Sequence, residues 1–308
     1  MNTVWYDYKK AQVSNGAAIA IGNFDGLHKG HAEIMNTLKK VSSENNLLSI
    51  CYTFSHHPIN VIKGENSLPL IASNHHKEIL LDQIGIDTLF FEDFCKVKDL
   101  PAEDFVRDIL LGELNMKVIV VGLHNHYGKN GEGDVKLLRH LGQKYGFLVY
   151  MVEPLYLDSV MCSSTKIREY IRSGEIEKAN EMLGRPFTIS NVIIKDKELG
   201  KKIGFPTANM MPESNMLMPK SGVYATSTIV DGKIFKSITN VGDCPTVGDE
   251  KIKFETHILD FEGNLYDKEI EVLFLHKMRD IVSFSDINSL KEQLSVDVRA
   301  RREMNGKR

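Results

Sequence analysis

Short apolar runs alternate with amphipathic stretches along the N-terminal half of the chain. The apolar runs have the length of strands, and the stretches between them place apolar residues at helical spacing. The predicted strands are 17–22, 47–54, 87–92, 117–122 and 147–155, and the predicted helices between them are 31–46, 75–85, 102–115 and 134–146. Strand followed by helix, repeated in this way, predicts an α/β unit with a parallel sheet and helices on both faces.

The pattern changes in the C-terminal part of the chain. Residues 163–183 have helical spacing with a break at Gly174, and the tripeptide RPF at 185–187 marks a boundary. Short strand-like runs separated by turn signals follow, at 192–195, 222–230, 232–242, 253–261 and 268–278. This spacing predicts a small antiparallel β-barrel or sandwich, closed by an amphipathic helix over 285–304. We therefore expect two domains, 1–184 and 185–308.

Composition agrees with this division and narrows the class of protein. A chain of 308 residues is too long for one ordinary core, and its 42% apolar and 26% charged content is typical of globular proteins. A net charge of −3 predicts no general attraction to nucleic acid or to acidic membranes. The four cysteines lack CxxC spacing, no apolar run spans a bilayer, and the N-terminus lacks an apolar signal core. These features predict a cytoplasmic protein with free thiols, and they leave its oligomeric state open.

The sequence IGNFDGLHKGH at 21–31 follows directly after an apolar strand. A glycine-rich turn from strand to helix brings backbone N–H groups close to phosphate. His28 and His31 are three residues apart, so both face one side at the start of a helix and can donate hydrogen bonds to phosphate oxygens. Two polar residues at the start of an exposed helix would have the same spacing, and the pattern alone leaves both interpretations open.

Two motifs in the N-terminal part resemble a known superfamily. GNFDGLHKGH resembles the HxGH signature of nucleotidyltransferases, and CSSTKIR at 162–168 resembles the SSTxIR motif of the same superfamily. The resemblance implies that Ser163, Ser164 and Thr165 bind phosphate through their hydroxyls and a helix N-terminus, and that Arg168 binds the β- and γ-phosphates. Taken alone, Ser-Ser-Thr before a helix is also an ordinary capping run.

The particular residues of these motifs indicate one family within the superfamily. Together with TFSHHP at 53–58 and VGLHNHYGKNGEGD at 121–134, they resemble the adenylyltransferase module of bacterial bifunctional riboflavin kinase/FAD synthetases. The resemblance implies that His28 and His31 act on the ATP phosphates while FMN attacks the α-phosphate and pyrophosphate leaves. The other residues implied to bind substrate are Gly22, Asn23, Phe24, Asp25, Gly30 and Asn125.

A second set of motifs resembles the riboflavin kinase module of the same enzymes. GKKIGFPTANM at 200–210, NVGDCPTVG at 240–248 and FETHILDF at 254–261 carry this resemblance. Glu255 would be the base that accepts the ribityl 5′-hydroxyl proton, although a solvent-facing strand residue would show the same alternation. Thr207 and Asn209 alternate along an extended segment, and their oxygens suit Mg²⁺. The nucleotide-binding residues implied are Gly200, Gly204, Pro206, Thr207, Asn209 and Asn240. Arg299 or Arg301 of the closing helix would contact the flavin.

Some positions depart from the family pattern. His56 replaces the usual proline, and Tyr127 stands where phenylalanine is common. At positions 124 and 125 the family usually has an acidic residue or asparagine followed by an aromatic residue, and this chain has His124 and Asn125. In the kinase module the segment 195–199 lacks the usual early glycines. These departures leave two alternatives open, in which only one of the two activities is retained or the chain is a non-catalytic flavin sensor. The HNH tripeptide at 124–126 does not by itself predict a metal site, because no third ligand lies at the spacing that metal ligands require.

The complete hypothesis is therefore a bifunctional enzyme of flavin cofactor synthesis. The expected fold is an N-terminal Rossmann-like nucleotidyltransferase domain over 1–184 and a C-terminal riboflavin-kinase-like β-barrel with a closing helix over 185–308. Its substrates and products would be riboflavin, ATP, FMN and FAD, with Mg²⁺ as cofactor. No nucleic acid or membrane partner is expected.

Overall fold

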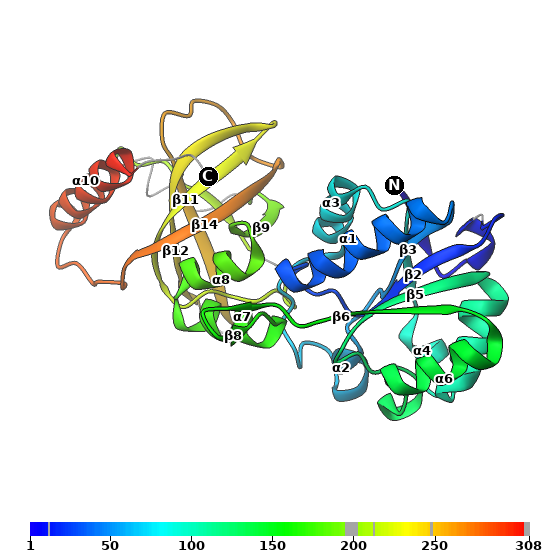
Figure 1. Ribbon diagram of the computed structural model, residues 1–308. Coiled ribbons are helices and arrows are strands. Elements are labelled where there is room, and N and C mark those ends of the chain that lie inside the picture. The colour runs from blue at the N-terminus through cyan, green and yellow to red at the C-terminus, as the bar shows by residue number, and fades with distance from the viewer. Residues whose placement is uncertain (12, 195–202, 212, 247–248, 305–308) are drawn as a thin grey trace. The chain divides into compact units, whose positions relative to one another are not determined.

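The computed structural model describes residues 1–11, 13–194, 203–211, 213–246 and 249–304 (Figure 1). The chain divides into two compact units, Met1–Ser163 and Ser164–Arg308. The first is an α/β unit with a parallel sheet, and the second is built on an antiparallel sheet, so the predicted fold class is confirmed. The domain boundary expected at 184/185 stays a prediction.

The first unit contains a six-stranded sheet in the order β1-β4-β3-β2-β5-β6, and every neighbouring pair is parallel. Its strands are β1 (Asn2–Trp5), β2 (Ala17–Ile21), β3 (Leu48–Phe54), β4 (Thr88–Glu92), β5 (Met116–Gly122) and β6 (Leu148–Val152). All five residues of β2 are buried, as expected for the centre of a parallel sheet covered on both faces. Strand β1 was not predicted, because four residues at a sheet edge are too few to show a period.

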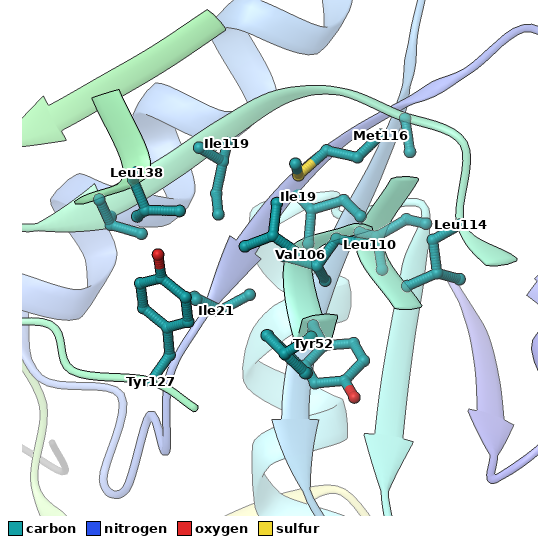
Figure 2. Packing of buried hydrophobic residues seen from close by; sticks show 14 of the residues in the cluster. Ile19, Ile21, Tyr52, Val106, Leu110, Leu114, Met116, Ile119, Tyr127 and Leu138 are labelled. Atoms are coloured by element: carbon teal, nitrogen blue, oxygen red, sulfur yellow. The ribbon is translucent and has the colours of Figure 1, made fainter. Parts of the chain in front are cut away.

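Helices cover both faces of this sheet, and the side chains of β2 show which helices face each side. Ala18 and Ala20 pack in a cluster with residues of α1 and α3. Ile19 and Ile21 pack in another cluster with residues of η2 and α6, and Figure 2 shows this second core. The helices of this unit are η1 (Tyr8–Ala11), α1 (Lys29–Glu44), α2 (Pro58–Lys63), α3 (Asn74–Ile84), α4 (Phe94–Val97), α5 (Ala102–Asp104), η2 (Phe105–Glu113), η3 (Lys129–Gly131) and α6 (Val135–Tyr145), and a hairpin of β7 (Tyr156–Leu157) and β8 (Val160–Met161) follows.

The predicted helix over 102–115 differs from the structure in its winding. It begins as α5 and continues as the π-helical segment η2, where the N–H of Leu114 donates to the carbonyl of Ile109 over 3.1 Å. The wider turn still buries Phe105, Val106 and Leu110. The apolar pattern therefore predicted the helix and its buried side. It did not predict the wider π-helical winding, which changes the hydrogen bonding without a visible change in that pattern.

The second unit begins with α7 (Ser164–Ser173) and α8 (Ile176–Leu183), separated by Gly174 at φ +85°. Its antiparallel strands lie in the order β10-β13-β12-β11-β14-β9, and a bridge between Ile194 and Asn209 joins the two edge strands, so the sheet closes on itself. These strands are β9 (Phe187–Val192), β10 (Ala208–Met210), β11 (Gly222–Val230), β12 (Lys233–Thr246), β13 (Asp249–Ile258) and β14 (Glu269–Arg279). The strand expected at 192–195 is therefore misplaced, because β9 shares only Val192 with it, and Lys195 lies outside the described residues.

The closing helix is α10 (Ile287–Glu303), as predicted, and Asp286 caps its N-terminus by accepting from the N–H groups of Asn288 and Ser289. Val298 of this helix packs on a cluster of Val223, Ile238 and Leu259. The helix therefore covers part of the outer face of the barrel.

Candidate active sites

The loop between β2 and α1 carries the first motif and has an unusual backbone. Phe24, Gly26 and Leu27 all have positive φ, at +45°, +79° and +39°. Phe24 and Leu27 are nevertheless buried, 2% and 5% exposed, in the core beneath α1. The loop is therefore held in a left-handed conformation by the burial of its two apolar side chains, and such turns direct backbone N–H groups into concavities that bind anions.

His28 and His31 are brought together at the N-terminus of α1. His28 is the N-cap residue, and its Nδ1 accepts from the N–H of His31 over 3.3 Å. The two rings stack with centroids 3.6 Å apart. With Nδ1 as the acceptor, a neutral His28 ring carries its proton on Nε2, so Nε2–H is the donor of that ring.

The surroundings of His31 keep its ring neutral. Its Nδ1 is buried without a hydrogen-bond partner in the described part of the chain. Burial lowers the pKa of His31 well below its usual 6.5, and the nearby His28 and Lys77 lower it further. At neutral pH His31 thus contributes a dipole and an N–H group to this site, and it carries no full charge.

The second motif meets the first at Cys162. Its Sγ lies 3.6 Å from Nδ1 of His28, and a side chain at Gly30 would come within 3.2 Å of the His28 ring, so glycine leaves the space that this ring needs. Ser163 is half-buried at the end of the first unit. Ser164, Thr165 and Arg168 lie on α7 of the second unit, where Arg168 is 6% exposed.

Asp25 and Asn23 connect the loop to the residues behind it. The carboxylate of Asp25 is 4% exposed and accepts from the N–H groups of Ile71 and Ala72 over 3.0 and 3.2 Å. The carbonyl of Asn23 accepts from the Lys77 ammonium over 3.2 Å. In this structure both residues therefore stabilise the loop.

Lys77 was missed by the motifs, although the sequence carries a signal for it. On α3 the two buried side chains are Lys77 and Leu81, one helical turn apart. A lysine thus occupies a position on the buried stripe of a helix where an apolar residue is expected. A charged residue in such a place points to a function other than packing.

A cavity of about 730 Å³ opens beside the loop. Gly22, Asn23 and Asn125 line it, and the Nδ2 of Asn125 is buried without a hydrogen-bond partner in the described residues. Two further residues of the 121–134 segment line the same cavity. His124 is exposed there, whereas Tyr127 is buried, and its ring lies beside Ile21 with its hydroxyl toward Leu138 (Figure 2).

In the second unit the pairing of strands aligns three side chains of the kinase motifs. Asn209 lies opposite Glu255 across β10 and β13, and Glu255 lies opposite Asn240 across β13 and β12. Residues directly opposite in an antiparallel sheet share a face, so a carboxylate stands between two amides. Glu255 is half-buried, and its role as the base stays a prediction.

A cavity of about 580 Å³ lies at this end of the barrel. Pro206, Thr207 and Asn209 line it, and the Oδ1 of Asn209 is buried without a hydrogen-bond partner among the residues described. The ring Nδ1 of His257 lies 2.8 Å from the carbonyl of Pro206 and so ties this turn to β13. Gly204 is exposed at φ +89°, and Gly200 lies outside the described residues.

Arg301 does not point into either cavity. Its side chain is fully buried, and its guanidinium donates to the carbonyls of Thr226 and Ser237 over 3.0 and 3.2 Å. Arg299 is exposed and bonds within its own helix. Arg301 therefore attaches α10 to the barrel.

Three further observations concern metal ligands, membrane-spanning helices and cysteines. Within the described residues no group of three His, Cys, Asp or Glu side chains is placed to hold a metal ion. Over the same residues no helix is long and apolar enough to cross a membrane. The cysteines whose side chains are described, Cys51, Cys95 and Cys162, are free thiols.

The two units together define a class of two-domain transferase, with a nucleotidyltransferase-type α/β unit and an antiparallel kinase-type barrel. Comparison with known proteins makes this specific. The FAD synthetase family model matches residues 10–166, and the riboflavin kinase family model matches residues 183–305. The chain belongs to the bifunctional riboflavin kinase/FMN adenylyltransferase family.

Two relatives carry the name of this family, and one solved structure with a different description matches the fold. The chain is 34% identical over 292 residues to the bifunctional riboflavin kinase/FMN adenylyltransferase of Buchnera aphidicola subsp. Schizaphis graminum, covering 93% of each chain. It is 32% identical to the protein of the same name from Pseudomonas fluorescens, covering 93% of this chain and 92% of the relative. A crystal structure described as a macrolide-efflux protein from Streptococcus pneumoniae matches with a TM-score of 0.89 and 25% identity, over 99% of this chain and all of the other.

Proposed function

We propose that this protein makes both flavin nucleotides, phosphorylating riboflavin to FMN with ATP and then adenylylating FMN to FAD with a second ATP. Family models for both activities match, one to each part of the chain. The observation that carries the proposal is that each part also contains its own polar site beside a cavity. Riboflavin, ATP, FMN and FAD are accordingly its small-molecule substrates and products, and we place the protein in the cytoplasm.

In the first unit the reaction is displacement at phosphorus. A phosphate oxygen of FMN attacks the α-phosphorus of ATP, the new P–O bond forms, and the bond to pyrophosphate breaks. The Nε2–H of His28 and the neutral ring of His31 are placed at a helix N-terminus, where donors stabilise the charge that develops on phosphate oxygens. We assign FMN to the 730 Å³ cavity, with the unpartnered Nδ2 of Asn125 as a hydrogen-bond donor to the flavin.

In the second unit the reaction is phosphoryl transfer to a hydroxyl. The ribityl 5′-oxygen of riboflavin attacks the γ-phosphorus of ATP, its proton passes to the Glu255 carboxylate, and ADP leaves. Asn240 and Asn209 stand on either side of Glu255 and limit where a substrate hydroxyl can approach it. We assign the ATP of this reaction to the 580 Å³ cavity beside Thr207.

The same cavity suits Mg²⁺. The buried, unpartnered Oδ1 of Asn209 and the hydroxyl of Thr207 line it together, and both are hard oxygen donors. Mg²⁺ bound there would neutralise phosphate charge during the transfer. Thr207 and Asn209 are therefore the residues that we propose to hold it.

Separate variants of the two sites test the assignment. Replacing Glu255 by Gln should abolish FMN formation from riboflavin while FAD formation from added FMN continues, because the base of one site is lost and the other site is intact. Replacing both His28 and His31 by Ala should have the opposite effect. Chromatography of the flavins formed with ATP and Mg²⁺ measures both activities, and Glu269→Gln, at an exposed position of β14, is the control.

The same assay separates the alternatives. A wild-type protein that forms only FMN or only FAD has retained one activity, and flavin binding without turnover by either unit would identify a sensor. Equal loss of both activities in each variant would contradict two separate sites.

A further inference from the structure

Lys77 is a buried charged residue of the first unit that no motif includes. Only 5% of it is exposed, it lies on α3, and its Nζ is 5.7 Å from the centroid of the Phe91 ring. Burial lowers its pKa, and Asp25 and Cys51 offset part of this effect. Moving an ammonium group out of water is energetically unfavourable, and well-packed apolar replacements of buried charges are often neutral or stabilising. Stability alone therefore does not account for a lysine at this position.

The ammonium group acts on one atom of the phosphate-binding loop. It donates to the carbonyl of Asn23 over 3.2 Å, and the same carbonyl accepts from the Oγ1 of Thr53 over 3.1 Å. In a trans peptide the C=O and N–H point in opposite directions, so these two donors also fix the direction of the N–H of Phe24. One carbonyl with two donors thereby sets the orientation of a whole peptide plane.

That peptide plane needs support, because the next residue is strained. Phe24 has φ +45°, and Leu27 follows at +39°, values that are strained for residues other than glycine. His28 begins immediately after this segment as the N-cap of α1. A shift of the Asn23 carbonyl would therefore move the backbone that leads directly to both histidines.

We propose that Lys77 is a positioning residue for adenylyl transfer, which fixes the Asn23 carbonyl and so holds the loop and His28 in the reactive arrangement. This inference rests on the proposed adenylyl transfer in the first unit. Lys77 acts through the loop backbone and need not touch ATP. Its loss should consequently affect the rate of the chemical step more than the binding of ATP.

The test compares two lysine-to-methionine variants. Lys77→Met removes the charge while keeping the length of the side chain. Lys39→Met is the matched control, because Lys39 also donates to a backbone carbonyl, that of Ile84 over 2.7 Å at the other end of α3. Steady-state kinetics of FAD formation give kcat and KM for ATP, riboflavin phosphorylation by the same samples is the internal control, and a thermal melt checks folding.

We expect Lys77→Met to lower kcat for FAD formation about 100-fold with little change in KM for ATP, as for the misplacement of a reacting group. FMN formation and the melting temperature should not fall, and Lys39→Met should behave as wild type. Thr53→Val removes the second donor to the same carbonyl and should lower the same kcat. It also provides a second measurement if Lys77→Met does not fold.

Three results would overturn the positioning role: wild-type kcat in both Lys77→Met and Thr53→Val, an equal loss in Lys39→Met, or a rise in KM for ATP with unchanged kcat. The last result would indicate direct contact with ATP. A wild-type protein that forms no FAD would instead contradict the proposed function, so the two failures are distinguishable.

Discussion

His31 is a half-buried titratable residue whose surroundings affect the stability of the protein. Its pKa in the folded protein lies well below 6.5, first because of burial and then because of His28 and Lys77. Above pH 6.5 the ring is neutral in both the folded and the unfolded state. As the pH falls below 6.5 the unfolded state binds a proton that the folded state does not, so the free energy of unfolding decreases.

We therefore expect wild type to lose stability more steeply than His31→Gln between pH 6.5 and about 5, since glutamine removes this proton uptake. Urea unfolding of both proteins at several pH values measures the two slopes. Parallel slopes would show that His31 titrates normally in the folded protein.

Tyr127 offers a second test at the scale of one residue. Its hydroxyl is buried in the apolar core without a hydrogen-bond partner among the described residues, and burial raises the pKa of its phenol (Figure 2). Removing a buried unpaired hydroxyl avoids a desolvation cost of about 1–3 kcal/mol. Tyr127→Phe should accordingly raise the free energy of unfolding of the first unit by about 1 kcal/mol.

Tyr52→Phe is the matched control for this prediction. The Tyr52 hydroxyl is also buried but donates to Glu92 over 2.9 Å, so its removal should destabilise the same unit. Urea unfolding in the absence of flavin measures both variants. A loss of stability in Tyr127→Phe would mean that the hydroxyl has a partner after all.

At the scale of elements, α10 depends on one arginine for its attachment. Arg301 is fully buried and donates to carbonyls of β11 and β12, whereas Arg299 on the same helix is exposed. Arg301→Ala should destabilise the second unit by about 1–3 kcal/mol, because it leaves the buried carbonyls of Thr226 and Ser237 without this donor. Arg299→Ala should have little effect, and thermal melts of the two variants provide the comparison.

The activities of the same variants add a second readout. Loss of Arg301 should reduce FMN formation by loosening the helix, while FAD formation from added FMN continues. If Arg299→Ala reduced FMN formation in a protein of wild-type stability, the flavin contact expected from the sequence would lie at Arg299.

At the scale of the whole molecule, the position of the domain boundary is testable. The helices α7 and α8 belong to the second compact unit, which begins at Ser164. The side chain of Asn180 in α8 donates to the carbonyl of Phe274 over 2.8 Å and accepts from the N–H of Phe187 over 2.7 Å. These bonds join α8 to β14 and β9 of the barrel.

A fragment of residues 164–308 should therefore melt at a higher temperature than a fragment of residues 185–308, which lacks both helices. Asn180→Ala in the longer fragment should remove part of the difference, because it leaves the Phe187 N–H and the Phe274 carbonyl without this partner. Equal melting temperatures of the two fragments would favour the boundary at 184/185 that the sequence suggested.

Much of the fold follows from the sequence because its signals are local. The buried run of β2 and the amphipathic α1 and α6 carry their periods within a few residues, and the turn signals separate the strands of the barrel. The spacing of His28 and His31 likewise requires only that a helix begin there. The sequence alone thus determined the two fold types, the family resemblance and the position of the histidine loop.

Only the tertiary structure decided which distant residues meet. Asn209, Glu255 and Asn240 become neighbours through strand register, and no local pattern states which strand pairs with which. Lys77 reaches the Asn23 carbonyl because α3 packs on the same face of the sheet as α1. Local periodicity specifies the helices, the strands and the side of each that is buried. The partners of polar groups depend instead on packing between residues that are far apart in the sequence, so only the tertiary structure determines those partners.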